Sequence, residues 1–393
     1  MPPERIYLDH HATTPCDPAV VAAMLPFFTE KYGNSSSLSH SFGREAQAAV
    51  EEARRLVAAL VGALPEEIVF TSGATESDNL AIRGLARTSR ERGRHVVTTS
   101  IEHSAVLEPC RTLEREGFEI TRLEVSEEGV LDVSRLEAAL RPDTILVSVM
   151  AANNEVGTLQ PIADIGALCR ARGIAFHCDA AQALGRIPVD VVASAVDLMS
   201  LSAHKMYGPK GVGALYVRRG AKPRLRLAAQ AEGGGQEKGL RSGTLNVPGI
   251  VGFGVAARLA QDALAAGEPD RIRGLRDRLL AGLMRRVDGV SLNGAQEPRL
   301  AGNLNVSIAR AEAERVLLTL GERFALSSGA ACAEAGGQGS HVLRALGLGD
   351  DRIYTALRFG LGRYNVEAEV DVVVAAVAEA ADAVRARSAP LPR

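Results

Sequence analysis

The residues of this sequence that are best able to do chemistry follow apolar, strand-like runs. One cluster, Ser202, His204 and Lys205, comes directly after the run 197–201. A lysine at a strand end can lose its charge when it is desolvated, and its neutral amine then attacks carbonyl carbons. Most lysines are solvated at the surface, however, and Lys210 is a competitor in a nearby turn sequence. This cluster alone therefore does not separate a catalytic lysine from a surface one.

Polar side chains also follow two other strand-like runs. Asp179 and Gln182 come after the run 174–178, and Asn154 comes after the run 144–150. A carboxylate in such a place can pair with the protonated pyridine nitrogen of pyridoxal 5′-phosphate (PLP), which keeps the ring able to accept electrons. A helix cap or a buried ion pair would explain a lone aspartate equally well, and asparagine is a common turn residue.

A turn and a histidine add two further parts of a possible ligand site. The turn 71–77 joins a strand to a helix, and its free N–H groups and small hydroxyls suit a phosphate. An ordinary capped helix start needs the same residue types, and no Walker motif follows. His103, after the run 95–99, could stack on a planar ring and move protons, although a single histidine is more often structural.

Two residues late in the chain could act on a substrate. Cys332 lies in the glycine-rich segment 329–340, which has no apolar periodicity and predicts an exposed, mobile loop. A reactive thiol needs such access, whereas the other four cysteines lie in or beside regular elements. Arg358 is a charge within the apolar run 356–359, so it needs a carboxylate partner from the protein or from a substrate.

The elements that must position these residues alternate along the chain. From about residue 45 to 220, β-rich runs and helical patterns alternate, which predicts an α/β fold with a largely parallel sheet flanked by helices. Ligands gather at the carboxyl ends of the strands in such sheets. Later segments predict a smaller α+β domain, with helices at 249–266 and about 271–286 and strands near 303–308 and 356–359. We expect a large domain at 16–255 and a small domain formed by 1–15 and 256–393.

Composition limits the classes of function. The 393 residues carry a formal net charge of −2 and no tryptophan, so we expect no nucleic-acid or membrane partner. No secretory signal and no bilayer-spanning run is recognisable. Five widely spaced cysteines, with no Cys-x-x-Cys pair, predict free thiols in a reducing cytoplasm and no zinc or other metal site.

The set of motifs resembles the PLP-dependent cysteine desulfurases of the NifS and IscS type, in the long-loop group of the class V aminotransferase family. The resemblance extends from Tyr7 to Arg363. The matching segments, which follow one another in the same order, are 12–15, 70–77, 153–157, 204–211, 241–244, 327–332 and 342–347. Among the departures, His10 and His11 replace a pair that is usually not two histidines.

This resemblance implies a fold-type I PLP enzyme that works as a homodimer, with its active sites at the subunit interface. The residues implied to bind the cofactor are Lys205 (as a Schiff base), His103 (stacked on the ring), Asp179 (at the pyridine nitrogen), Asn154 and Gln182 (near the ring hydroxyl), Ala74, Thr75, Ser202 and His204 (at the phosphate), and Thr244 from the partner subunit. Asn34 and Arg358 would bind the substrate carboxylate, and Cys332 would be the nucleophile.

The activity implied by the resemblance is removal of sulfur from L-cysteine. It yields L-alanine and a persulfide on Cys332, which passes to a scaffold or sulfur-carrier protein for the assembly of iron–sulfur clusters or other thio-cofactors. A selenocysteine lyase would share the fold and the PLP residues. An aminotransferase of the same fold would not need Cys332, and a non-catalytic binding protein would need none of the site.

Overall fold

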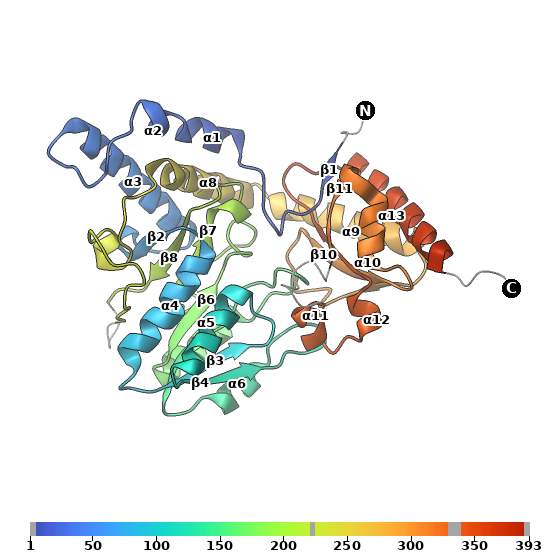
Figure 1. Ribbon diagram of the computed structural model, residues 1–393, viewed down its shortest axis with the longest axis horizontal. Helices are drawn as coiled ribbons and strands as arrows, with labels where there is room; N and C mark the ends of the chain where they lie inside the picture. Colours follow the sequence, from blue (N-terminus) through green and yellow to red (C-terminus); the bar gives the residue numbers. More distant parts are fainter. Residues whose placement is uncertain (1–4, 221–224, 329–338, 389–393) are drawn as a thin grey trace.

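A seven-stranded sheet forms the centre of the larger part of the molecule (Figure 1). The computed structural model describes residues 5–220, 225–328 and 339–388. The strands are β2 (Ile68–Thr71), β3 (His95–Thr99), β4 (Glu119–Leu123), β5 (Thr144–Ser148), β6 (Ala175–Asp179), β7 (Leu198–Ser202) and β8 (Gly213–Val217). Their order is β2-β8-β7-β6-β5-β3-β4, with β8 antiparallel to both neighbours and the pairs from β7 to β4 parallel. The predicted α/β fold with a mostly parallel sheet is confirmed.

Helices cover both faces of this sheet. They are α1 (Pro18–Met24), α2 (Pro26–Thr29), α3 (Ser41–Leu60), α4 (Ala74–Ser89), α5 (Ser104–Arg115), α6 (Val133–Ala139), α7 (Ile162–Arg172) and α8 (Val247–Ala265), with 3₁₀ turns η1 (Pro65–Glu67), η2 (Ala203–Lys205) and η3 (Glu237–Gly239). Successive strand residues point to opposite faces. Thus Leu146 and Ala175 pack with α4 and α5, whereas Val147 and Phe176 pack with α3, α7 and α8.

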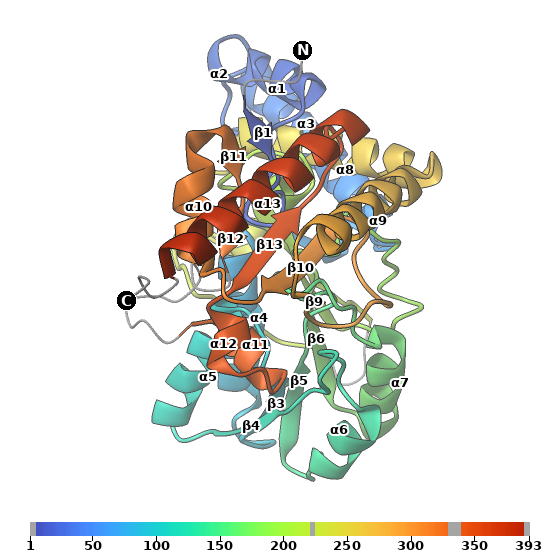
Figure 2. The same ribbon diagram turned by 90° about the vertical axis from the view of Figure 1, so that its right-hand side faces the viewer.

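A second core lies beside the first (Figure 2). An antiparallel sheet contains β9 (Val290–Leu292), β10 (Asn303–Ile308), β12 (Ser327–Ser328) and β13 (Ala356–Gly360), and β1 (Ile6–Tyr7) pairs with β11 (Phe324–Ala325). The helices α9 (Glu268–Arg286), α10 (Ala313–Leu320) and α13 (Glu367–Ser388) pack in this core, and the 3₁₀ turn η4 (Gly321–Arg323) follows α10. The short helices α11 (His341–Ala345) and α12 (Asp350–Ile353) pack instead with Ile101 and Met150 of the larger part. The predicted helices and strands after residue 249 are therefore present. Among the described residues, no helix has the length and apolar character to cross a bilayer.

The two cores suggest where the boundary between the large and the small domain lies. Ile6 and Leu8 pack in the second core with Leu279 and Phe359, which supports assigning the first residues to the small domain. We propose a boundary near Gly267 in place of residue 255, because α8 continues to Ala265 and its later residues still pack in the first core.

A buried ion pair ties the start of the sheet to its surroundings. Arg54 of α3 bonds both carboxylate oxygens of Glu237, at 2.8 and 2.7 Å, and also the carbonyl of Ile68. Glu237 in turn accepts from the backbone N–H of Phe70 (2.8 Å). Together these bonds anchor β2, the strand that leads into the 72–76 turn.

We expect Arg54→Met to destabilise the protein, because the variant leaves the carboxylate of Glu237 buried without its cation. The free energy of unfolding in urea should fall by about 3 kcal/mol. Arg55→Met is the matched control, since Arg55 pairs with Glu52 in solvent and its loss should leave the unfolding midpoint unchanged. Equal midpoints for both variants would contradict the expectation.

Candidate active site

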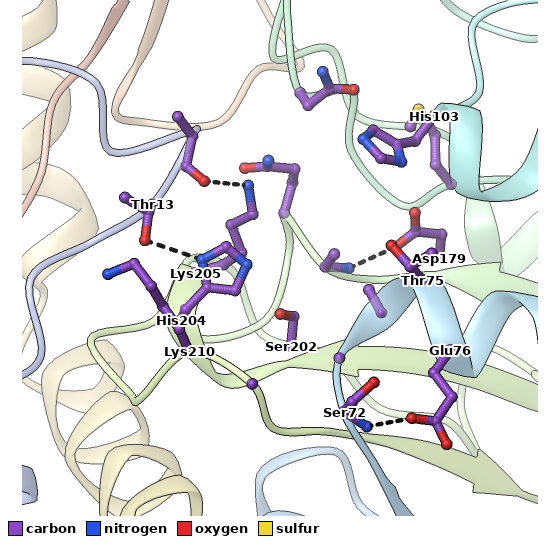
Figure 3. Close-up of a pocket in the computed structure, with 18 of the residues that line it drawn as sticks. Thr13, Ser72, Thr75, Glu76, His103, Asp179, Ser202, His204, Lys205 and Lys210 are labelled. Carbon is purple, nitrogen blue, oxygen red and sulfur yellow. Dashed lines mark hydrogen bonds between the residues drawn. The ribbon is translucent and has the colours of Figure 1, made fainter. Parts of the chain in front are cut away.

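A cavity of about 560 Å³ opens at the carboxyl ends of β6 and β7, beside the start of α4 (Figure 3). Sequence reasoning placed candidate residues at these strand ends, and the fold brings most of them together. The predicted residues that line the cavity are Ala74, Thr75, His103, Asn154, Asp179, Gln182, Ser202, His204 and Lys205. Their positions agree with a common site, while the role of each remains a prediction.

Lys205 ends the 3₁₀ turn η2, directly after β7. Its Nζ donates to the backbone carbonyls of His11 (2.6 Å) and Ala12 (2.8 Å), so the N-terminal segment holds the amine in place. Burial, together with the positive charges of Arg186 and Arg358, lowers the pKa of Lys205 to about 8. A substantial fraction of the amine is therefore neutral and nucleophilic near neutral pH.

Asp179 and His103 lie on the opposite side of the cavity from Lys205 (Figure 3). One carboxylate oxygen of Asp179 accepts from the N–H of Ala181 (2.8 Å). Burial raises the pKa of Asp179 to about 6, and the charge of Asp78 acts in the same direction. His103 caps α5, and its Nδ1 accepts from the N–H of Ala105 (3.1 Å), which places the proton of a neutral ring on Nε2.

The start of α4 provides free backbone donors. Its N-cap, Gly73, has a φ of 151°, a conformation that favours glycine, and no side chain caps the helix. The first N–H groups of a helix have no partner within it, and they attract anions. Glu76, which sequence reasoning missed, lines the cavity and accepts from Ser72 N (2.7 Å) and Arg241 Nε (2.9 Å). These bonds shape the turn around the helix start.

Ser202 and His204 line the floor of the same cavity. Nδ1 of His204 lies 3.0 Å from Oγ1 of Thr13. Burial lowers the pKa of His204 to about 4, and the charges of Lys205 and Lys210 contribute in the same direction. His204 is therefore neutral near pH 7 and available as a hydrogen-bond partner for a bound anion.

Arg358 obtains its carboxylate partner from the protein. Its guanidinium bonds Oδ1 of Asp9 (2.9 Å) and Oγ of Ser327 (3.0 Å), and it also donates to the carbonyl of Asn154 (3.1 Å). The arginine thus borders the site without being one of the lining residues of the cavity. Asp9 was not singled out from the sequence, where it only follows a short strand-like run.

Besides Arg358, two predicted site residues of the described part of the chain do not line the cavity. Asn34 and Thr244 are exposed and absent from its lining, and Oδ1 of Asn34 accepts from the N–H of Ser36. Cys332 and most of the segment predicted to be a mobile loop lie outside the described residues. Of the other thiols, Cys110, Cys169 and Cys178 are buried, and burial raises the pKa of each, whereas Cys16 is half-buried. Within the described part of the chain, no cluster of three or more metal-binding side chains exists.

Comparison with known proteins establishes the class of this protein. Residues 6–373 match the family model "Aminotransferase class-V", so the chain belongs to this family. A solved structure described as "NIFS-LIKE PROTEIN" superposes with a TM-score of 0.89 at 39% identity, over 95% of this chain and 98% of the other. Another, "SspA in complex with cysteine", gives a TM-score of 0.79 at 38% identity over 92% of this chain and 99% of the other.

Within the family, the chain belongs with the cysteine desulfurases of the IscS and NifS type. It is 56% identical to "Cysteine desulfurase IscS" of Anaeromyxobacter dehalogenans (strain 2CP-C), over 94% of this chain and 90% of that protein. It is 51% identical to "Cysteine desulfurase" of Rattus norvegicus, over 94% of this chain and 81% of that protein. The resemblance found in the sequence motifs is thus confirmed.

Proposed function

We propose that this protein is a PLP-dependent cysteine desulfurase. It converts L-cysteine to L-alanine and leaves the sulfur as a persulfide on Cys332. The observation that carries the proposal is the amine of Lys205, with its lowered pKa, in one cavity with the buried carboxylate of Asp179 and the uncapped start of α4.

The residues of the cavity fit PLP. A cationic pyridine nitrogen would stabilise the ionised form of a buried carboxylate such as Asp179. The free backbone donors at Ala74 and Thr75 suit a phosphate. Lys205 would hold the aldehyde carbon, His103 would lie against the ring, and the proposed contacts near the ring hydroxyl are Asn154 and Gln182. The remaining phosphate contacts would come from Ser202 and His204. When bound, PLP supplies a ring that stabilises negative charge on the α-carbon of the substrate.

The protein itself supplies the proton transfers and the sulfur acceptor. The neutral amine of Lys205 removes the α-proton of cysteine. Arg358, whose Nε has no partner among the described residues, and Asn34 would bind the substrate carboxylate. The thiolate of Cys332 attacks the substrate sulfur, so the Cβ–S bond breaks as an S–S bond forms, and a proton takes the place of sulfur on Cβ. Cysteine and a thiol thus become alanine and a persulfide without an external oxidant. A sulfur-acceptor protein for iron–sulfur cluster or thio-cofactor assembly takes the persulfide, in the reducing cytoplasm.

The test is turnover of L-cysteine by the purified, PLP-loaded protein in the presence of a reductant. We expect alanine and sulfide in equal amounts and, without reductant, a mass increase of one sulfur on the peptide that contains Cys332. Formation of a keto acid in place of alanine would instead indicate an aminotransferase. A parallel assay with selenocysteine separates a desulfurase from a selenocysteine lyase.

We further propose that the enzyme is a homodimer whose partner completes each site. Exposed, large apolar side chains concentrate in the segment 21–42, and Phe28 and Tyr32 are 58% and 64% exposed. Asn34 lies within this segment, and it is outside the cavity of its own chain, as is Thr244. Apolar exposure of this kind is typical of a protein interface. A second copy would cover the segment and could bring Thr244 to the neighbouring cavity.

Phe28→Asp should therefore weaken the dimer, because it places a charge among apolar side chains at the interface. We expect the dimer dissociation constant to rise about 100-fold in sedimentation equilibrium. Leu318→Asp is the matched control, since Leu318 of α10 is 80% exposed but lies outside the segment 21–42. An unchanged dimer in Phe28→Asp, or equal dissociation in both variants, would refute this interface.

A further inference from the structure

We propose that Arg186 is a positioning residue for Lys205: its guanidinium holds the backbone at His10 and Lys205 in place and sets a positive charge near the lysine amine. This inference rests on the proposed function, because it concerns the same lysine. It also gives a role to His11, one of the two histidines that depart from the usual pattern of the family. Arg186 itself lies in the turn 181–186 after β6 and carries no motif signal in the sequence.

Arg186 connects both parts of the chain that hold Lys205. One amino group, NH2, donates to the carbonyls of His10 (2.5 Å) and of Lys205 itself (3.2 Å). The other, NH1, donates to Nδ1 of His11 and to Oε1 of Gln182 (3.2 Å). The amide nitrogen of Gln182 donates to the His11 carbonyl (3.0 Å), which is also an acceptor for the amine of Lys205 (2.6 Å). The guanidinium therefore supports the His11 carbonyl indirectly, through Gln182 and through the backbone of His10.

The His11 ring packs against the side chains of both Arg186 and Gln182. Its Nδ1 lies within hydrogen-bonding distance of the Arg186 guanidinium and 3.0 Å from Oε1 of Gln182. Burial lowers the pKa of His11 well below its ordinary value, and the charge of Arg186 acts in the same direction. His11 therefore remains neutral around pH 7 and adds no charge of its own.

The charge of Arg186 is not compensated by its contacts. All of the acceptors just named are neutral. The positive charge of Arg358 nearby lowers the pKa of Arg186 and so disfavours its protonated form. Burial lowers the pKa of Arg186 to about 10, so the guanidinium is still protonated at neutral pH. Arg186 thus contributes a full positive charge that disfavours protonation of Lys205.

Several other ionisable groups face Lys205. Arg358 also lowers its pKa, whereas Asp179 and Asp9 raise it, and burial has the largest effect. His204 and His11 are neutral neighbours, and Lys210 lines the same cavity. Because Lys205 has a lowered pKa, its positive charge is lost as the pH rises through about 8, well below the ordinary lysine value of 10.5. Removing Arg186 should move this transition upward.

The test measures how fast the full-length, cofactor-free protein takes up PLP at a series of pH values, followed by visible absorbance. Uptake needs the neutral amine of Lys205, so the wild-type rate should rise with pH and level off above about 8. In Arg186→Gln the transition should move up by about one unit, which slows uptake at pH 7 by up to about tenfold. Arg186→Lys keeps a positive charge at pH 7, so its uptake rate at that pH should lie closer to the wild-type rate than that of Arg186→Gln.

The matched control is Arg299→Gln. Arg299 is buried, and like Arg186 it bonds neutral acceptors, among them the carbonyl of Ala295 and Oδ1 of Asn303. It does not line the cavity, so its removal should leave the uptake profile unchanged. The uptake profile of each variant also contains the titration of PLP itself. That contribution is the same in every variant, so it cancels in the comparison with Arg299→Gln.

Each outcome decides the proposal. An Arg186→Gln profile that matches the wild type overturns it, and so do equal shifts in Arg186→Lys and Arg186→Gln, because these would show an effect of packing and not of charge. Should Arg186→Gln not fold, Arg186→Met takes its place, and an Arg186→Met profile that matches the wild type likewise overturns the proposal. A wild-type transition near 10.5 would also overturn it. A wild-type protein that takes up no PLP at any pH rejects the proposed function itself, which distinguishes the two failures.

Discussion

Replacement of Lys205 by alanine should abolish turnover of L-cysteine, with alanine formation falling by about 10⁴-fold or more. The variant loses both the amine that would hold PLP and the base that would remove the α-proton. The carbonyls of His11 and Ala12 hold the Lys205 amine at one place in the cavity. Another amine would have to reach that place to replace it as the base. Alanine is measured by amino-acid analysis over a time course long enough to detect slow residual turnover.

Lys210 provides the matched control for this prediction, because it lines the same cavity and was the rival lysine in the sequence. After reduction with borohydride, we expect PLP bound to the peptide that contains Lys205 in the wild type and in Lys210→Ala. No covalent PLP should remain in Lys205→Ala. Trapping on Lys210 would overturn the assignment and move the catalytic amine to the turn before β8.

Replacement of Cys332 by serine should stop sulfide release while leaving the earlier steps intact. A serine hydroxyl is a poor nucleophile near neutral pH, and it cannot form a persulfide. The variant should still bind PLP, and its absorbance should still change on addition of L-cysteine. Sulfide production should fall by about 10³-fold or more, since nucleophilic attack is lost.

Cys16→Ser is the control for this variant, because Cys16 is the thiol among the described residues that is not fully buried. It should release sulfide at the wild-type rate. Full sulfide release by Cys332→Ser would remove Cys332 from the reaction. A loss of PLP binding in that variant would also contradict the expectation, since the proposed cofactor contacts do not include this thiol.

Much of the site could be predicted because strand ends are visible in the sequence. Apolar runs mark β6 and β7, and polar residues such as Asp179 and Lys205 follow them directly. Parallel strands place these ends at one edge of the sheet, so residues far apart in the chain converge there. Likewise, α7 ends at Gly173, a glycine that is visible in the sequence and whose φ of 63° is the left-handed conformation that glycine adopts readily.

The contacts that adjust the site could not be predicted in this way. Asp9 pairs with Arg358 across 349 positions of sequence, and Lys205 bonds the carbonyl of His11 across 194. A backbone carbonyl has no residue-type signature, so no motif could indicate that the segment 10–12 holds the amine. Arg186 was missed for the same reason. Of its four acceptors, two are backbone carbonyls and a third is the side-chain amide of Gln182, which lies four positions earlier in the chain.

The sequence by itself therefore determined the fold class, the family and the set of residues around Lys205, because periodicity and local motifs encode strands, turns and reactive side chains. Only the tertiary structure decided which of these residues share one cavity and which, like Asn34 and Thr244, lie outside it in a single chain. It also decided the electrostatic state of Lys205. That state depends on burial and on charges from distant segments, which meet only when the two cores pack together.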